Sequence, residues 1–163
     1  MSLELKVGDK AVYPAHGVGE VMGIERKIIG GQKQAFYVLR ILENNMKIMI
    51  PKKSVRDVGI RGLISKREVD DVYDVLRKKV KVSSNQIWNR RYREYMEKIK
   101  TGEVDKIASV LRDLCLLKLE KELSFGERKM LDTARNLLIK ELALATAQTE
   151  EKIQKKIDSF FVN

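Results

Sequence analysis

The chain has 163 residues, and its 33 Lys and Arg side chains against 23 Asp and Glu give a formal net charge of +10. Its 44% of hydrophobic and 34% of charged residues exclude a disordered chain, and no apolar run approaches the roughly 20 residues of a membrane span. The single cysteine, Cys115, excludes a disulfide or a cysteine-based zinc site within one chain.

Residues 1–62 are predicted to form a small β domain. Four short segments rich in β-branched and aromatic residues are separated by turn residues, at 11–13, 19–24, 34–41 and 46–50. Gly30 and Gly31, like Asn44 and Asn45, suit tight turns because Gly and Asn tolerate a positive φ. Pro51 cannot donate a ladder hydrogen bond, so the last strand should end early or lie at a sheet edge. The spacing predicts a strongly bent sheet or an SH3-like barrel.

Residues 63–163 are predicted to form a five-helix domain, because the hydrophobic pattern changes to a helical period near residue 65. Ser65 with Glu68, and Ser124 with Glu127, have the spacing of capping boxes that begin helices. The helices are expected over about 65–79, from a polar break at 82–85 to 102, over 104–117, over 124–145 and from 149 onward. The fold class is therefore α+β.

The positive charge is concentrated in the middle of the chain. Two acids, Glu94 and Glu97, lie between residues 77 and 100 among nine basic residues: Arg77, Lys78, Lys79, Lys81, Arg90, Arg91, Arg93, Lys98 and Lys100. Residues 103–163, in contrast, carry eleven residues of each sign. A solvated helix face would carry balancing acids, so the imbalance favours a surface that binds a polyanion.

Trp88, the only tryptophan, lies in this basic stretch and has two interpretations. On a helix it shares an apolar stripe with later residues, which predicts packing in the core: Tyr92, Tyr95 and Ile99. Its place in the first turn of the helix, beside three arginines, instead predicts an exposed wedge that could enter between bases. The residues alone leave both interpretations open.

No group of residues resembles a catalytic site. His16 has no Cys, Ser or acid in a recognisable arrangement, and a lone His in a β-turn is usually structural. The glycines at 17 and 19 lead into a strand, so they fail the test for a nucleotide-binding loop. Cys115 lies in an apolar helical run, which indicates a core thiol. We expect no enzyme, no metal site and no cofactor.

Five segments together resemble one protein family. They are VGDKAVYPAHGVG at residues 7–19, YVLR at 37–40, MIP at 49–51, WNRRY at 88–92 and LSFGERKMLDTAR at 123–135. In this order they resemble the CarD family of bacterial transcription regulators, especially its stand-alone, CdnL-type members. The opening motif is less specific, because the RNA-polymerase-interacting module of transcription-repair coupling factors shares it.

The resemblance implies that residues 1–62 form a Tudor-like domain that docks on the β subunit of RNA polymerase. The family's contacts come from the strand and turn that match residues 37–40 and from the residue that matches Pro51. The residues that carry over are Val38, Leu39 and Pro51. Because neighbouring strand residues point to opposite faces of a sheet, Val38 and Leu39 should not both face the polymerase.

The resemblance also implies that residues 63–163 contact promoter DNA at the upstream edge of the melted bubble. Trp88 matches the family's aromatic wedge, Arg90 and Arg91 match its phosphate contacts, and Met96 belongs to the same patch. The DNA contact would be weak and indifferent to sequence, because the polymerase supplies the placement. The net result would be a stabilised open promoter complex.

The remaining expectations concern partners and location. The start of the chain has neither the basic segment nor the apolar core of a signal peptide, so we expect a cytoplasmic monomer, associated with the nucleoid through RNA polymerase and with no membrane contact. Two other functions fit the same residues. One is a protein-binding adaptor with Trp88 in its core, and the other is an RNA- or ribosome-associated factor with an SH3-like module.

Overall fold

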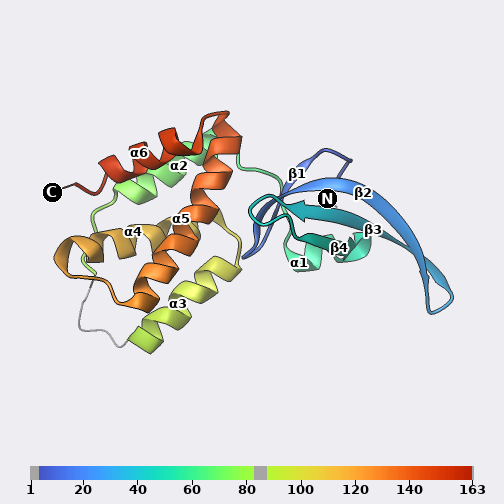
Figure 1. The fold of residues 1–163 in the computed structure, drawn as a ribbon, viewed down its shortest axis with the longest axis horizontal. Coiled ribbons are helices and arrows are strands. Elements are labelled where there is room, and N and C mark those ends of the chain that lie inside the picture. Colours follow the sequence, from blue (N-terminus) through green and yellow to red (C-terminus); the bar gives the residue numbers. More distant parts are fainter. Residues whose placement is uncertain (1–3, 83–87, 163) are drawn as a thin grey trace. The chain divides into compact units, whose positions relative to one another are not determined.

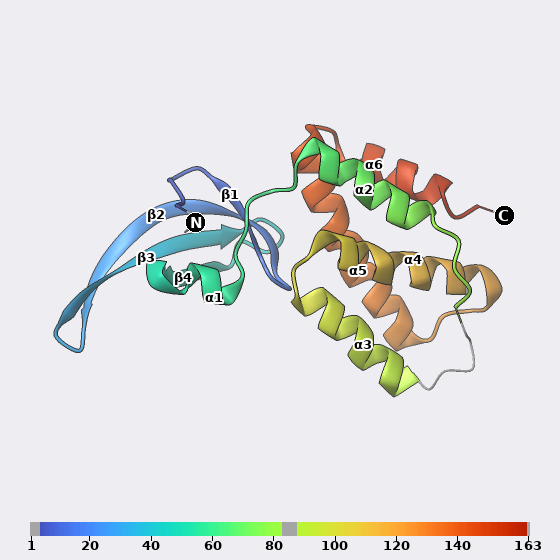
Figure 2. The ribbon, with the colours of Figure 1, turned by 180° about the vertical axis from the view of Figure 1, so that it is seen from behind.

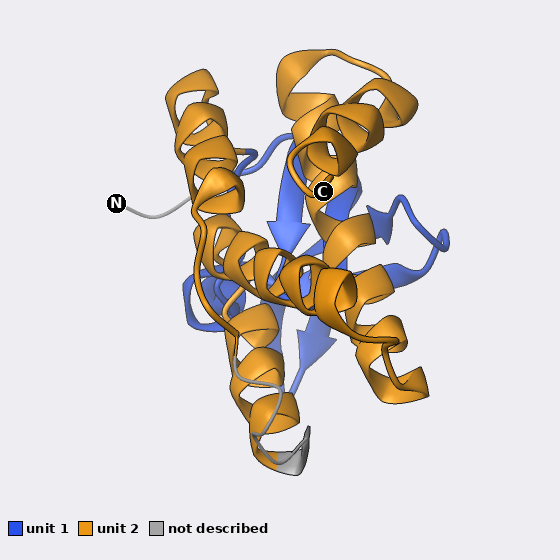
Figure 3. Cartoon of the chain, turned by 90° about the vertical axis from the view of Figure 1, so that its left-hand side faces the viewer, with its two compact units in different colours: residues 1–63 blue, residues 64–163 orange. Residues whose placement is uncertain are grey.

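The computed structural model describes residues 4–82 and 88–162. The chain divides into two compact units, Met1–Leu63 and Ile64–Asn163 (Figure 3). Strands dominate the first unit and helices make up the second (Figure 1), so the α+β class is confirmed. Within the described ranges, no helix has the length and apolarity needed to cross a membrane.

The first unit contains one curled antiparallel sheet with the strand order β1-β2-β3-β4 (Figures 1 and 2). Its strands are β1 (Lys10–Tyr13), β2 (Gly17–Ile29), β3 (Gln32–Ile41) and β4 (Lys47–Pro51). Gly30 and Gly31 join β2 to β3 with φ values of 59° and 79°, which confirms the predicted tight turn. β4 is an edge strand that ends at Pro51, also as predicted.

Strands β2 and β3 are longer than predicted. Their outer parts, residues 25–29 and 32–33, are exposed on both faces and lie beyond the buried core. Such a two-stranded ribbon has no buried face to impose alternation, so the hydrophobic pattern cannot identify it. The ribbon is held together by backbone pairing, which extends from Glu25 opposite Phe36 to Ile29 opposite Gln32.

The core of the first unit lies on one face of the sheet. Its fully buried side chains include Val21, Leu39 and Ile41. A Cβ atom on Gly19 would lie 2.6 Å from Cγ of Leu39, so this close approach requires glycine. After β4 come two short elements that the sequence did not predict, η1 (Lys52–Ser54) and α1 (Val55–Val58), because one turn of helix is too short to show a period.

The described part of the second unit contains the five expected helices. They are α2 (Lys66–Arg77), α3 (Trp88–Lys100), α4 (Val104–Glu120), α5 (Phe125–Thr146) and α6 (Glu150–Ser159). Both predicted capping boxes are present, at Ser65 and Ser124. The polar break expected over 82–85 lies outside the described residues from position 83 on.

Helix α4 lies at the centre of the second unit and packs against α2, α3 and α5, while α6 packs against α5 (Figures 1 and 2). Its inward side chains Leu111, Leu114 and Leu117 are fully buried. At the start of the unit, the backbone N–H of Ile64 donates a hydrogen bond of 3.1 Å to the buried Glu141 carboxylate of α5. Helix α3 therefore rests on a continuous apolar core.

Candidate functional site

The outer face of the sheet, opposite the core, carries an apolar patch. Val38 on β3 lies beside Met49 on β4 and beside Gly23 on β2, so the three share this face. Val38 is half-buried, Met49 is 38% exposed, and Gly23 leaves open space. Pro51 is half-buried and shares the face two residues farther along β4, opposite Phe36. We call Val38, Met49 and Pro51 the outer-face patch.

Leu39 departs from the expectation that it contacts a partner. Its side chain is 1% exposed and lies in the core, where it faces Val21 and Ile48 across the neighbouring strands. The cause is the strict alternation of a β-strand, which sends Val38 outward and Leu39 inward. Of the three residues implied by the resemblance, only Val38 and Pro51 lie on the outer face.

Two exposed residues near this patch, Lys27 and Met22, and one residue within it, Met49, were not singled out from the sequence. Nζ of Lys27 on β2 lies 3.8 Å from Sδ of Met49, so a positive charge borders the patch. Met22 is the extra residue of an irregularity between Val21 and Gly23, and it is 45% exposed. Met49 belonged to a quoted motif, but its place in an apolar strand concealed its orientation.

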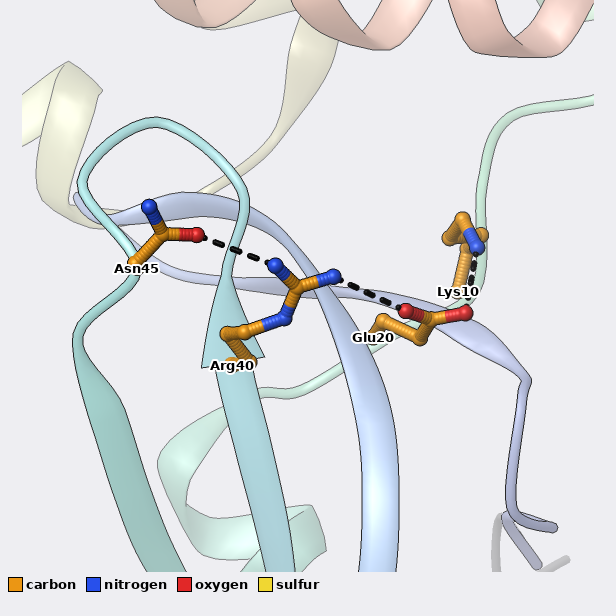
Figure 4. Close-up of polar contacts among 4 residues, drawn as sticks. All are labelled: Lys10, Glu20, Arg40 and Asn45. Carbon is orange, nitrogen blue, oxygen red and sulfur yellow. Dashed lines mark hydrogen bonds and ion pairs between the residues drawn. The ribbon is translucent and has the colours of Figure 1, made fainter.

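A polar cluster borders the other end of the patch (Figure 4). The carboxylate of Glu20 accepts hydrogen bonds from Nζ of Lys10 at 3.0 Å and from the guanidinium of Arg40 at 3.2 Å. Arg40 also donates to the side-chain oxygen of Asn45 at 3.0 Å, which ties the β3–β4 turn to the sheet. The bonds from Lys10 and Arg40 lower the pKa of Glu20, so the cluster stays charged and paired at neutral pH.

The free edge of β4 adjoins the outer-face patch. β4 pairs with β3 on one side and is the last strand of the sheet. An exposed edge offers unpaired backbone donors and acceptors to an incoming strand, and Pro51 limits that ladder at one end. The unit thus combines a backbone edge with apolar side chains, which is the chemistry of strand addition.

Helix α3 presents a basic face in the second unit. The Arg90 side chain is 78% exposed, and its Nε lies 3.6 Å from the Glu94 carboxylate one turn later. Arg93 is also exposed. Trp88 is the first residue of the helix, and its side chain, with its predicted exposure, lies outside the described part of the chain. We call Arg90 and Arg93 the α3 basic face.

Arg91 departs from the expectation that it lies open to phosphates. It is 3% exposed, and its guanidinium lies 4.0 Å from a carboxylate oxygen of Glu127, which is buried to the same degree. Position 91 is one and two turns before the buried residues Tyr95 and Ile99, so it lies on the packed side of α3. The structure places this charge inside the unit.

The predicted apolar stripe of α3 is confirmed in part. Tyr95 and Ile99 are buried, whereas Tyr92 is 44% exposed. The buried stripe includes position 91 instead of 92, because a helix advances by about 100° per residue and one step turns a side chain away. Met96 is half-buried against the core, so only part of its side chain is available to a partner.

Phe125 is a further candidate that the sequence did not single out. It is the first residue of α5 and is 74% exposed. Two residues later, Glu127 faces Arg91 of α3, so Phe125 belongs to the same end of the unit as the start of α3. The sequence around Phe125 gives no signal of a binding role, because a phenylalanine in the first turn of a helix is common. Its exposed side chain is what makes it a candidate contact residue.

The two residues considered for catalysis, Cys115 and His16, both pack against neighbouring side chains. Cys115 packs against the helical core, and burial raises the pKa of its thiol to about 11. His16 lies in a turn with its ring 5.0 Å from that of Tyr13 in an edge-on contact. Among the described residues, no three His, Cys, Asp or Glu side chains gather as a metal site requires.

Comparison with known proteins covers both units. Residues 5–64 match the family model described as "CarD-like/TRCF RID domain", and residues 71–158 match that of "CarD, C-terminal domain". A Bacillus subtilis (strain 168) protein named "Putative transcription factor YdeB" is 36% identical over 151 residues, which cover 91% of this chain and 97% of that protein.

Two solved structures are similar to part of this chain. CdnLNt from Myxococcus xanthus is 62% identical and covers 40% of this chain and 93% of its own, with a TM-score of 0.34. The 72-residue N-terminal domain of Myxococcus xanthus CarD, solved by NMR, is 40% identical and covers 38% and 83%, with a TM-score of 0.32.

The family resemblance found in the sequence is thereby confirmed for both units. The two family matches and the full-length relative show that this chain belongs to the CarD family and is a transcription-associated regulator.

Proposed function

We propose that this protein docks on the β subunit of RNA polymerase through its first unit and stabilises the promoter open complex through its second. The outer-face patch and the free edge of β4 make the polymerase contact. The α3 basic face binds phosphates at the upstream edge of the bubble, and Trp88 packs as a wedge where the strands would reclose.

The proposed contact with RNA polymerase is supported by the outer-face patch. Val38 and Met49 leave apolar surface open to solvent beside an unpaired strand edge, on a domain whose family model includes the transcription-repair coupling factor module. Lys27 at one end adds a charge that can select an acidic partner surface. Contiguous apolar patches that are exposed on a folded domain mark sites of protein interaction.

The proposed contact with promoter DNA is supported by the exposed arginines of α3. Arg90 and Arg93 can neutralise phosphates without reading sequence. Phe125 adds an exposed apolar ring at the same end of the unit. Melting has already unstacked the bases, so an aromatic wedge would not meet that cost of roughly a few kcal/mol itself. A preference of about 1.4 kcal/mol for the open form shifts the equilibrium tenfold.

The test is the lifetime of open promoter complexes after challenge with a competitor. Trp88→Ala should shorten the lifetime toward that of polymerase alone while the protein is still captured by immobilised β subunit. Met49→Asp should abolish both capture and the effect on lifetime, because it places a charge in the apolar contact. Val7→Asp is the matched control, since Val7 is exposed in the same unit and lies outside the patch.

Three results would count against the proposal. An unchanged lifetime with Trp88→Ala would exclude the wedge and favour a protein-binding adaptor. Capture that survives Met49→Asp would exclude the outer-face patch. Preference for RNA over forked duplex DNA would favour the RNA-associated factor.

A further inference from the structure

We propose that Arg91 is a positioning residue for the α3 basic face, and that it acts by holding the first turns of α3 against the capped start of α5. This inference rests on the proposed function of that face. It gives Arg91 a task different from the phosphate contact that the family resemblance implies.

The first observation is the way Glu127 is held. One oxygen of its carboxylate accepts hydrogen bonds from Nζ of Lys121 at 2.9 Å and from the backbone N–H of Ser124 at 2.8 Å. Both donors belong to the connection between α4 and α5, so the carboxylate is anchored there. The other oxygen lies 4.0 Å from the Arg91 guanidinium on α3. Glu127 therefore joins α3 to the connection before α5.

The second observation is burial. Arg91 and Glu127 are each 3% exposed. A guanidinium withdrawn from water needs compensating negative charge, and the Glu127 carboxylate supplies it at 4.0 Å. The pair thus disfavours any rotation of α3 that would separate Arg91 from Glu127. A charge held in this way is also out of reach of a phosphate.

The third observation is the contrast with Arg90. This neighbour is 78% exposed, and a helix turns about 100° per residue, so the two arginines face different sides of α3. The rotation of α3 about its own axis decides where Arg90 and Arg93 point. Arg91, through Glu127, sets that rotation.

The salt dependence of DNA binding separates the two tasks. The probe is a fluorescein-labelled forked duplex, titrated with the full chain between 50 and 200 mM salt, after circular dichroism has shown that each variant is folded. Arg90→Gln should lower the slope of log K against log salt by about one, as expected for a lost phosphate contact. Arg91→Met, which keeps an apolar stem, should weaken binding and lower the slope by about two, because both arginines of the α3 basic face would lose their phosphates. A slope lowered by about one in Arg91→Met would overturn the proposal.

Glu127→Gln gives an independent test that does not alter Arg91. Gln can keep the capping hydrogen bond at this position, so the start of α5 should persist. Removal of a negative charge alone should strengthen DNA binding, but loss of positioning should weaken it, and we expect weaker binding. The matched control is Glu94→Gln on the exposed side of α3, which should strengthen binding. Stronger binding by Glu127→Gln would contradict the proposal.

Hydrogen exchange distinguishes failure of this proposal from failure of the proposed function. Backbone amides of residues 91–100 should exchange faster in Arg91→Met and in Glu127→Gln, whereas α6 amides should not change. If the wild-type chain binds no forked DNA, the proposed function fails. The positioning is then judged by exchange alone, and unchanged exchange in both variants overturns it.

Discussion

Glu127 shows how one side chain can serve several elements. Burial raises its pKa, but hydrogen bonds from the backbone and hydroxyl of Ser124 and from Lys121 outweigh this, so the pKa lies below its ordinary value of 4.5. The carboxylate is therefore ionised at neutral pH in the folded unit. It caps α5, pairs with the α4–α5 connection and faces Arg91 of α3.

This lowered pKa predicts a dependence of stability on pH. A carboxyl with a folded pKa below its unfolded value contributes stability that is present above about pH 4.5 and is lost as pH falls through the folded pKa. Urea unfolding from pH 7 to pH 3 should show a difference in unfolding free energy between wild type and Glu127→Gln that shrinks below this pH. A constant difference would contradict the prediction. Glu94→Gln is the exposed control.

Cys115 should react slowly in the folded protein. Burial raises the pKa of its thiol to about 11, and only the thiolate is nucleophilic, so the thiol is protonated at neutral pH. Reaction with Ellman's reagent, followed by absorbance, should be much slower in buffer than in denaturing urea. Equal rates in both conditions would show that the side chain is accessible.

At the scale of elements, both sites depend on helix and strand ends. β4 ends at Pro51 on a free sheet edge, and α5 begins with the Ser124 capping box beside the exposed Phe125. The capping box marks where α5 begins, and its Glu127 carboxylate lies 4.0 Å from the Arg91 guanidinium of α3. Both candidate surfaces thus lie beside the ends of regular elements.

Ser124→Ala should destabilise the second unit. Loss of an N-cap side chain costs about 1 kcal/mol, because a backbone N–H at the helix start loses its acceptor. The free energy of unfolding, measured in urea by circular dichroism, should fall by about this amount. Ser159→Ala is the control, since Ser159 is the exposed last residue of α6. An equal loss in both variants would argue against a specific capping effect.

At the scale of the whole molecule, each unit contains its own buried cluster. Residues 64–163 should therefore fold alone, with a helical circular dichroism spectrum and a cooperative thermal transition. Residues 1–63 should likewise keep a dispersed NMR spectrum. If either fragment is unfolded, its core depends on the other unit.

The proposed tethering predicts weak binding to free DNA. The α3 basic face contains few arginines, so the isolated chain should bind duplex DNA with a Kd no tighter than about 10⁻⁶ M at physiological salt, and binding should weaken as salt is raised. Fluorescence anisotropy measures both quantities. Nanomolar binding under these conditions would show that placement by the polymerase is unnecessary.

Much of the fold could be predicted from the sequence. The helices with capping boxes, the glycine turn and the edge strand at Pro51 all come from local chemistry, because a cap or a positive φ involves a few neighbouring residues. The outer parts of β2 and β3 and the one-turn helix α1 were missed, since neither has a periodic apolar face.

The sequence by itself determined the family, the two kinds of unit and the concentration of basic charge around α3. Only the tertiary structure decided which side chains face outward. Leu39 and Arg91 are buried, although the family resemblance implied that they contact partners, and Tyr92 is exposed, although its place in the apolar stripe predicted burial. The physical reason is that orientation depends on contacts between elements far apart in the chain, such as Arg91 with Glu127. Composition and spacing do not contain those contacts.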